Sequence, residues 1–155
     1  MATKLIKLGN RVRITAPSAS AINVEIEKIL GRKAESVTKN NALRKQLAET
    51  YKVFVTPYVP MRTGKLRNSA KVTNEAKGPR IIWSATNKGK KYNANYAGLQ
   101  YQPWKYLVTN NWRNWHYTTP GTGPEWDKVF NADTDAWESF ISEITPSILE
   151  AYKNG

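Results

Sequence analysis

The stretch "DTDAWESFISEITPSILEAY", residues 133–152, gives the clearest indication of the fold. Its apolar residues recur at intervals of three and four, which is the period of an amphipathic α-helix. Asp133, Thr134 and Asp135 precede the pattern and offer caps and favourable negative charge for the first turn. Pro146 lies inside the pattern and is expected to kink or split the helix. The expected core-facing side is formed by Trp137, Phe140, Ile141, Ile144, Ile148, Leu149 and Tyr152.

Two further helical patterns lie in the first third of the chain. The first covers residues 22–30, and Gly31 is expected to interrupt it. The second is expected to begin at Asn40 or Asn41, either of which can serve as the N-cap, and to end before Pro57. The apolar positions that carry the two patterns are Ile22, Ile26, Ile29, Leu30, Leu43, Leu47, Tyr51 and Phe54 or Val55.

Short strands are expected around these helices. Residues 4–15 indicate one or two strands, and residues 70–72 and 80–84 indicate two more around a Gly-Pro turn signal at 78–79. The segment "YAGLQYQPWKYL", residues 96–107, is expected to form a turn and a strand.

The order of elements predicts an α+β fold. We expect a single domain over residues 1–155, in which an antiparallel β-sheet packs against a long N-terminal helical region and a C-terminal helix. Residues 1–18 are expected to form an N-terminal strand or arm. Residues 84–95 contain "NKGKKYNAN" and are expected to form an exposed basic loop, and the Gly-Pro-rich residues 118–124 an irregular one.

Charge is unevenly distributed along the chain. The net charge is +12, with 20 Lys/Arg and 5 Asp/Glu in residues 1–91 (net +15) and 4 and 7 in residues 92–155 (net −3). This asymmetry favours a polyanionic partner or head-to-tail contact between copies, while a lysine-rich solvated surface is the plain alternative. No run of eighteen apolar residues indicates a membrane span, and no secretory signal is recognisable.

The sequence offers little for catalysis. Cysteine is absent, and the single histidine, His116, lies between two aromatic residues. Asp127, Asp133 and Asp135 match no metal-binding spacing, and Ser69 lacks the Gly-x-Ser-x-Gly frame of a nucleophile elbow. We therefore expect a protein that is not an enzyme and that holds no cofactor and no metal.

Aromatic residues are concentrated in one region. Residues 92–126 hold 9 of the 17 Phe, Trp and Tyr residues. Protein interface anchors, core packing and base stacking all use such residues. Only Lys105 and Arg113 are basic in this region, which disfavours stacking on nucleic acid. The candidate protein interface consists of Tyr101, Trp104, Trp112 and Trp115.

Three ordered motifs carry a family resemblance. "PYVPMRTGKLRNSAKV" (57–72), "NYAGLQY" (95–101) and "HYTTPGTGPEWDKVF" (116–130) resemble the minor capsid proteins of tailed phages, within the wider neck or head–tail connector family. Arg62 departs from that pattern, which commonly has an acidic residue before Thr-Gly. The segment "PWKYLVTNNWRNW" is longer than expected, and residues 1–35 match nothing in the pattern.

The resemblance implies a structural virion protein at the head–tail junction, present in the host cytoplasm during assembly. It implies a homo-oligomeric ring that contacts head-closure and tail proteins around the DNA channel, without a membrane. Lys88, Lys90 and Lys91 are candidate contacts to the double-stranded DNA or to an acidic partner. A sequence-independent nucleic-acid-binding protein is the alternative function. The residues assigned to a docking or backbone-shaping motif are Pro57, Pro60, Thr63, Gly64, Leu66, Arg67, Ser69, Thr119, Pro120, Gly121, Gly123, Pro124 and Trp126.

Overall fold

Two compact units, each assembled from three stretches of sequence, make up the chain. We call residues 14–54, 72–81 and 130–155 the helical unit, and residues 1–13, 55–71 and 82–129 the motif unit. The mixture of helices with small antiparallel sheets confirms the expected α+β class. The computed structural model describes residues 12–14, 19–61, 64–75, 78–88, 93–95, 97–105, 117 and 119–154.

The longer helices begin and end where local sequence signals place them. Helix α1 (Ala19–Leu30) ends at Gly31, which has φ +73° and donates its N–H to the Glu27 carbonyl at 2.8 Å. Gly31 therefore terminates the helix instead of interrupting it. The short helix α2 (Glu35–Thr38) follows.

Helix α3 (Asn41–Val55) begins directly after Asn40, one of the two residues expected as its N-cap. The side-chain oxygen of Asn40 accepts the Leu43 N–H at 3.0 Å, so Asn40 is the N-cap. At the other end a 3₁₀ turn, η1 (Thr56–Tyr58), contains Pro57, as expected for a helix that stops before a proline.

Helix α7 (Thr134–Asn154) runs unbroken through Pro146, so of the two expected outcomes, a kink or a split, the split is wrong. The proline removes one backbone hydrogen bond, whereas Phe140, Ile144 and Ile148 are buried on both sides of it and hold the helix together. Asp133 caps the helix by accepting the Ala136 N–H at 3.2 Å.

The buried side of α7 is narrower than the sequence predicts. Phe140, Ile144 and Ile148 are buried, but Leu149 is 47% exposed and Tyr152 38% exposed. Both lie on a second stripe of the helix, beside the buried one.

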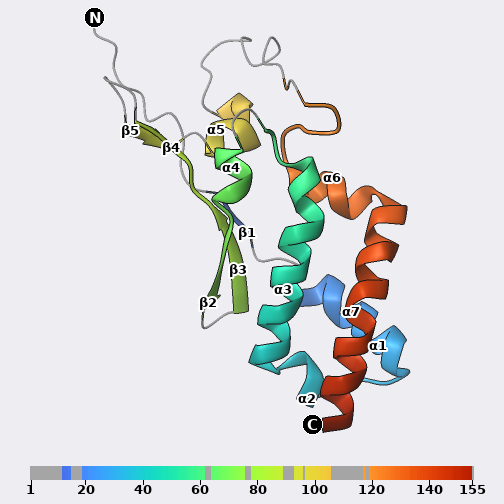
Figure 1. Ribbon diagram of the computed structural model, residues 1–155. Coiled ribbons are helices and arrows are strands. Elements are labelled where there is room, and N and C mark those ends of the chain that lie inside the picture. The colour runs from blue at the N-terminus through green and yellow to red at the C-terminus, as the bar shows by residue number, and fades with distance from the viewer. Residues whose placement is uncertain are drawn as a thin grey trace, which may run out of the picture. The chain divides into compact units, whose positions relative to one another are not determined.

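Aromatic packing between α3 and α7 forms the core of the helical unit. Gln46 hydrogen bonds Ser147 at one end and Phe54 packs on Phe140 at the other, so the two helices run antiparallel, side by side (Figure 1). The Tyr51 ring meets Phe130 at 5.3 Å and Phe140 at 5.5 Å, edge to face, a favourable geometry for aromatic pairs. Helices α1 and α2 also contact α7.

The chain forms one three-stranded and one two-stranded sheet in its described part. The first has the order β1 (Val12–Ile14), β3 (Gly78–Trp83), β2 (Lys71–Glu75). The Gly-Pro pair at 78–79 opens β3 and is not the turn before it, a correction consistent with the tolerance for proline at the start of a strand.

The segment expected as a basic loop is partly regular. Strands β4 (Thr86–Lys88) and β5 (Asn93–Asn95) pair antiparallel, with Thr86 opposite Asn95 and Lys88 opposite Asn93. The hydrogen bonds of so short a ladder join backbone groups, which every residue has. The polar sequence therefore gave no sign of this pairing.

Candidate functional site

The motif unit carries the residues that the sequence singled out, and Arg67 organises the first of its loops. The Arg67 Nε donates to the Val59 carbonyl at 2.8 Å, and its Nη2 donates to the Pro57 carbonyl at 3.1 Å. Val59 and Pro60 are buried. One guanidinium therefore fixes a proline-rich turn from two sides, as its rigid fork allows.

A short helix, α4 (Lys65–Asn68), positions Arg67. Its N-cap is Gly64, in the left-handed conformation at φ +82°. The preceding motif residue, Thr63, lies outside the described residues. Leu66, in the same helix, is buried. A glycine suits this position because a Cβ would strain the backbone there.

Ser69 joins the end of α4 to the segment after β3. Its hydroxyl donates to the Leu66 carbonyl at 2.6 Å and accepts the Ser84 N–H at 3.1 Å. The Ser69 hydroxyl, which by residue type alone could be a nucleophile, thus connects two backbone segments.

The Gly-Pro-rich loop is tied to the proline-rich turn. Thr119 donates its hydroxyl to the Met61 carbonyl at 2.8 Å, across 58 positions of sequence. Thr122 donates both its N–H and its hydroxyl to the Thr119 carbonyl, at 3.2 and 2.6 Å, and Gly121 adopts φ +82°. These bends confirm irregular backbone in residues 119–124. We call residues 57–61 together with 119–125 the docking frame.

Glu125 closes the docking frame. It is a non-glycine residue at φ +46°, and its N–H donates to the Tyr101 carbonyl at 2.9 Å. Its carboxylate accepts hydrogen bonds from Lys128 at 2.5 Å and Gln102 at 3.1 Å. The hydrogen bond from Lys128 outweighs partial burial and lowers the pKa of the Glu125 carboxyl.

An aromatic cluster supports the frame from within. Trp126 opens α6 (Trp126–Ala132) and is fully buried, packing edge to face on Trp83 at 5.5 Å and on Tyr101 at 4.8 Å. The Tyr101 hydroxyl donates to the Asp127 carboxylate at 2.5 Å. Trp126 is thus a core residue of the motif unit.

The segment after β5 is helical, contrary to the expected turn and strand. Helix α5 (Ala97–Tyr101) is followed by a 3₁₀ turn, η2 (Pro103–Lys105). Ala97 is buried and lies one helical turn before Tyr101, so a helix places both on one side. The Tyr117 hydroxyl donates to the Gln100 carbonyl at 2.7 Å, and burial raises the pKa of that hydroxyl.

The predicted interface residues are distributed unevenly. Tyr101 is half-buried in the aromatic cluster, whereas Trp104, in η2, is 38% exposed. Lys88 lies in β4, and its side chain is outside the described part. Trp112, Trp115, His116, Lys90 and Lys91 lie outside the described residues.

Three residues that contribute to the site were not predicted from the sequence: Gln102, Glu125 and Asp127. Gln102 and Glu125 meet only because α5 and the frame are adjacent, and Asp127 was considered only as a metal ligand. No local sequence signal announces these contacts. Among the described residues, no group of three or more His, Cys, Asp or Glu is placed to hold a metal ion. No helix in the same part of the chain is long and apolar enough to cross a membrane.

The arrangement is suited to holding backbone in a defined shape. Arg67, Ser69, Thr119 and Thr122 each donate a side-chain hydrogen bond to a main-chain carbonyl.

A family model described as minor capsid protein matches residues 21–144. Searches of curated proteins and of solved structures find no match.

Proposed function

Because this chain belongs to the minor capsid protein family and so to the structural proteins of the phage virion, we propose that it forms the ring connecting head to tail in the neck of a tailed phage. In this role, copies of the chain surround the channel through which the DNA passes. The head-closure proteins on one side and the tail proteins on the other are its partners.

The docking frame is the observation that carries the proposal. Its two loops are 58 residues apart at the Thr119–Met61 hydrogen bond, and the side chains of Thr119 and Arg67 donate hydrogen bonds to main-chain carbonyls. Residues 57–61 and 119–125 thereby acquire a shape that neither loop would keep alone. A shaped loop pair of this kind suits docking between proteins better than chemistry on a small molecule.

Two exposed apolar side chains, one in the docking frame and one outside it, provide contact area. Met61 is 42% exposed at the point where the two loops join, and Trp104 is exposed in η2. Large flexible or aromatic side chains at the centre of an interface commonly supply much of its binding energy. We assign Trp112 and Trp115 to the same interface, as the sequence suggested.

The net charge of +12 suits a protein that lines a DNA channel. Lys88, Lys90 and Lys91 would contact phosphates without sequence preference, and this contact weakens as salt rises. If the purified monomer instead bound free duplex DNA at nanomolar concentration in physiological salt, the alternative function of a nucleic-acid-binding protein would replace the ring.

Deletion of the coding region tests the proposal. We expect particles with DNA-filled heads and detached or missing tails, and restoration of tailed particles when the intact chain is supplied in trans. Normal tailed particles from the deletion would reject the neck role.

A matched pair of variants connects that test to the docking frame. Thr119→Val removes the hydroxyl that donates to Met61 and keeps the side-chain shape, whereas Thr50→Val removes an exposed hydroxyl that donates within helix α3. We expect only the first to reduce the fraction of tailed particles. Equal effects would assign the loss to folding.

A further inference from the structure

Beside its buried stripe, helix α7 carries a second and largely apolar stripe that is exposed toward its C-terminal end. Residues Ile141, Thr145, Leu149 and Tyr152 follow one another at intervals of four, four and three, so they lie along one side of the helix. Ile141 and Thr145 are half-buried, while Leu149 and Tyr152 are exposed to 47% and 38%. We call these four residues the α7 ridge.

Helix α7 and its N-cap residue carry a net charge opposite in sign to that of the rest of the chain. Residues 133–154 hold five carboxylates and one lysine, a net of −4, while the remainder of the chain has a net of +16. All five carboxylates are exposed: Asp133, Asp135, Glu138, Glu143 and Glu150. The exposed apolar end of the ridge, Leu149 and Tyr152, therefore lies on an acidic helix of an otherwise basic protein.

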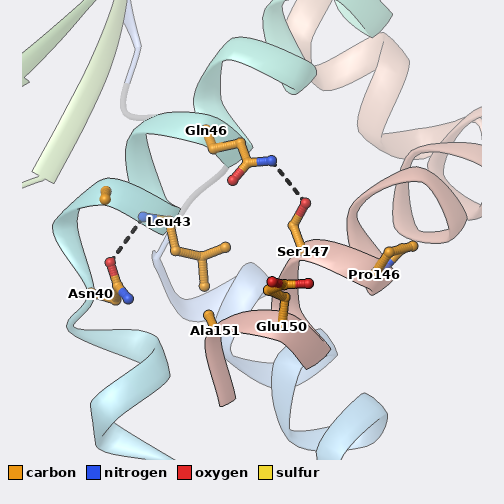
Figure 2. Close-up of a pocket in the computed structure, with 8 residues that line it drawn as sticks. Asn40, Leu43, Gln46, Pro146, Ser147, Glu150 and Ala151 are labelled. Atoms are coloured by element: carbon orange, nitrogen blue, oxygen red, sulfur yellow. Dashed lines mark hydrogen bonds between the residues drawn. The ribbon is translucent and has the colours of Figure 1, made fainter. Parts of the chain in front are cut away.

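A notch of about 430 Å³ lies between α3 and the C-terminal half of α7 (Figure 2). The Gln46 amide donates to the Ser147 hydroxyl at 2.8 Å across it, and Glu150 lines its α7 side. The notch therefore offers a carboxylate, an amide and a hydroxyl to a long cationic side chain.

We propose that the α7 ridge, with the acidic residues around it and the notch, is the surface on which a second copy of this chain docks through its basic residues. Two copies at +12 each repel one another, and contact between α7 of one and a basic face of the next replaces that repulsion with attraction. The two faces differ, so the contact is head-to-tail, and such contacts close into rings when the rotation allows. The inference rests on the proposed ring, which supplies the neighbouring copy.

A cross-linking experiment on purified particles tests the surface directly. The chain has no cysteine, so Leu149→Cys introduces a single thiol on the ridge, and Lys153→Arg in the same variant removes the amine one turn away on the same helix. A thiol-to-amine cross-linker then reaches lysines of a second copy. Val53→Cys, at a position 65% exposed on α3 and combined with Lys52→Arg, is the control. We expect the ridge variant to give a product of twice the chain mass, linked to a lysine of a second copy, and the control to give at least about tenfold less.

The outcomes separate this inference from the proposed function. A Leu149→Cys chain that stays monomeric, or that links to a different virion protein, overturns the ridge contact. If imaging of the same particles still shows the chain as a ring in the neck, the proposed function stands. If the chain is absent from the neck, both fail.

Charge reversal provides a second, independent test. Glu138→Lys/Glu143→Lys changes two exposed carboxylates of α7, and Glu27→Lys/Glu35→Lys makes the same change in net charge on α1 and α2. We expect the α7 pair to reduce the number of copies per particle at least about tenfold and the control pair to change it less than twofold. Equal loss in both would attribute the effect to net charge and refute a specific α7 contact.

Discussion

The helical unit and the motif unit hold their shapes by different means. In the helical unit, buried rings from α3, α6 and α7 pack against one another: Tyr51 meets both Phe130 and Phe140 edge to face. In the motif unit, the shape of the docking frame comes from side chains that donate hydrogen bonds to main-chain carbonyls, with Arg67 and Thr119 as the principal donors.

This difference indicates that the stability of the chain and the shape of its loops depend on different interactions. Burial of apolar surface is non-directional and tolerates similar side chains, so it stabilises a unit without fixing each loop. Hydrogen bonds to carbonyls are directional and add little net free energy, but they select one conformation. Substitutions in the helical unit should therefore lower stability, and substitutions in the docking frame should mainly alter loop geometry and assembly.

The largest effect is expected from Phe140→Ala. Phe140 is fully buried and its ring lies 5.4 Å from Trp137 and 5.5 Å from Tyr51. Truncation should reduce the free energy of unfolding by about 3–5 kcal/mol, because it leaves a cavity in the aromatic core. Urea unfolding measures this change. Tyr152→Ala, on the exposed ridge, should cost less than about 1 kcal/mol, and similar losses in the two variants would contradict the assigned core.

Arg67→Ala should have a smaller effect on stability and a clear effect on one loop. It removes the donors to the Val59 and Pro57 carbonyls, and we expect a loss of about 1–3 kcal/mol. Hydrogen exchange at the Val59 N–H, which donates to Thr56 at 3.0 Å, should accelerate. Arg67→Lys keeps the charge but lacks the two-pronged donor, so it should resemble the alanine variant. Full rescue by lysine would show that charge alone matters.

A glycine pair tests the bend in the docking frame. Gly121 has φ +82° and open space where a Cβ would lie, so Gly121→Ala should cost about 1–2 kcal/mol through backbone strain alone. Gly123 also has open space but lacks a positive φ in the strained range, so Gly123→Ala should leave thermal stability unchanged or raise it slightly. Equal shifts in melting temperature would contradict the assigned bend.

The smallest effect is expected from pH. The Lys128 hydrogen bond lowers the pKa of Glu125 in the folded state, so the unfolded state takes up the proton first as pH falls. The stabilisation is complete above the pKa of the unfolded chain and is lost as pH falls through the lower, folded pKa. Glu125→Gln should therefore reduce the decline of melting temperature on acidification. An unchanged decline would show that the pair contributes nothing to stability.

The helical unit was largely readable from the sequence because periodicity and caps act locally. Asn40 and Asp133 cap the helices as their positions suggested. The helix does not split at Pro146 because packing on both sides of the proline outweighs one missing hydrogen bond. The error at Leu149 and Tyr152 arose because apolar spacing alone does not tell a core stripe from an exposed one.

For the motif unit, the sequence predicted which segments matter but not the contacts between them. The Gly-Pro loop was expected to be irregular, yet its bond from Thr119 to Met61 depends on tertiary structure and leaves no local trace. The strands at 86–88 and 93–95 escaped notice because their pairing uses backbone groups that every sequence has. Trp126 was assigned to the motif from the resemblance, and only its packing on Trp83 and Tyr101 shows that it is core.

We propose that this member of the minor capsid protein family forms a ring in the neck. Electron cryo-microscopy of the neck in intact particles tests it most directly. We predict a ring of density around the DNA channel into which the helical and motif units fit, with the docking frame against a neighbouring protein. A neck that contains no copy of this chain, with the chain located elsewhere in the particle, would contradict the claim.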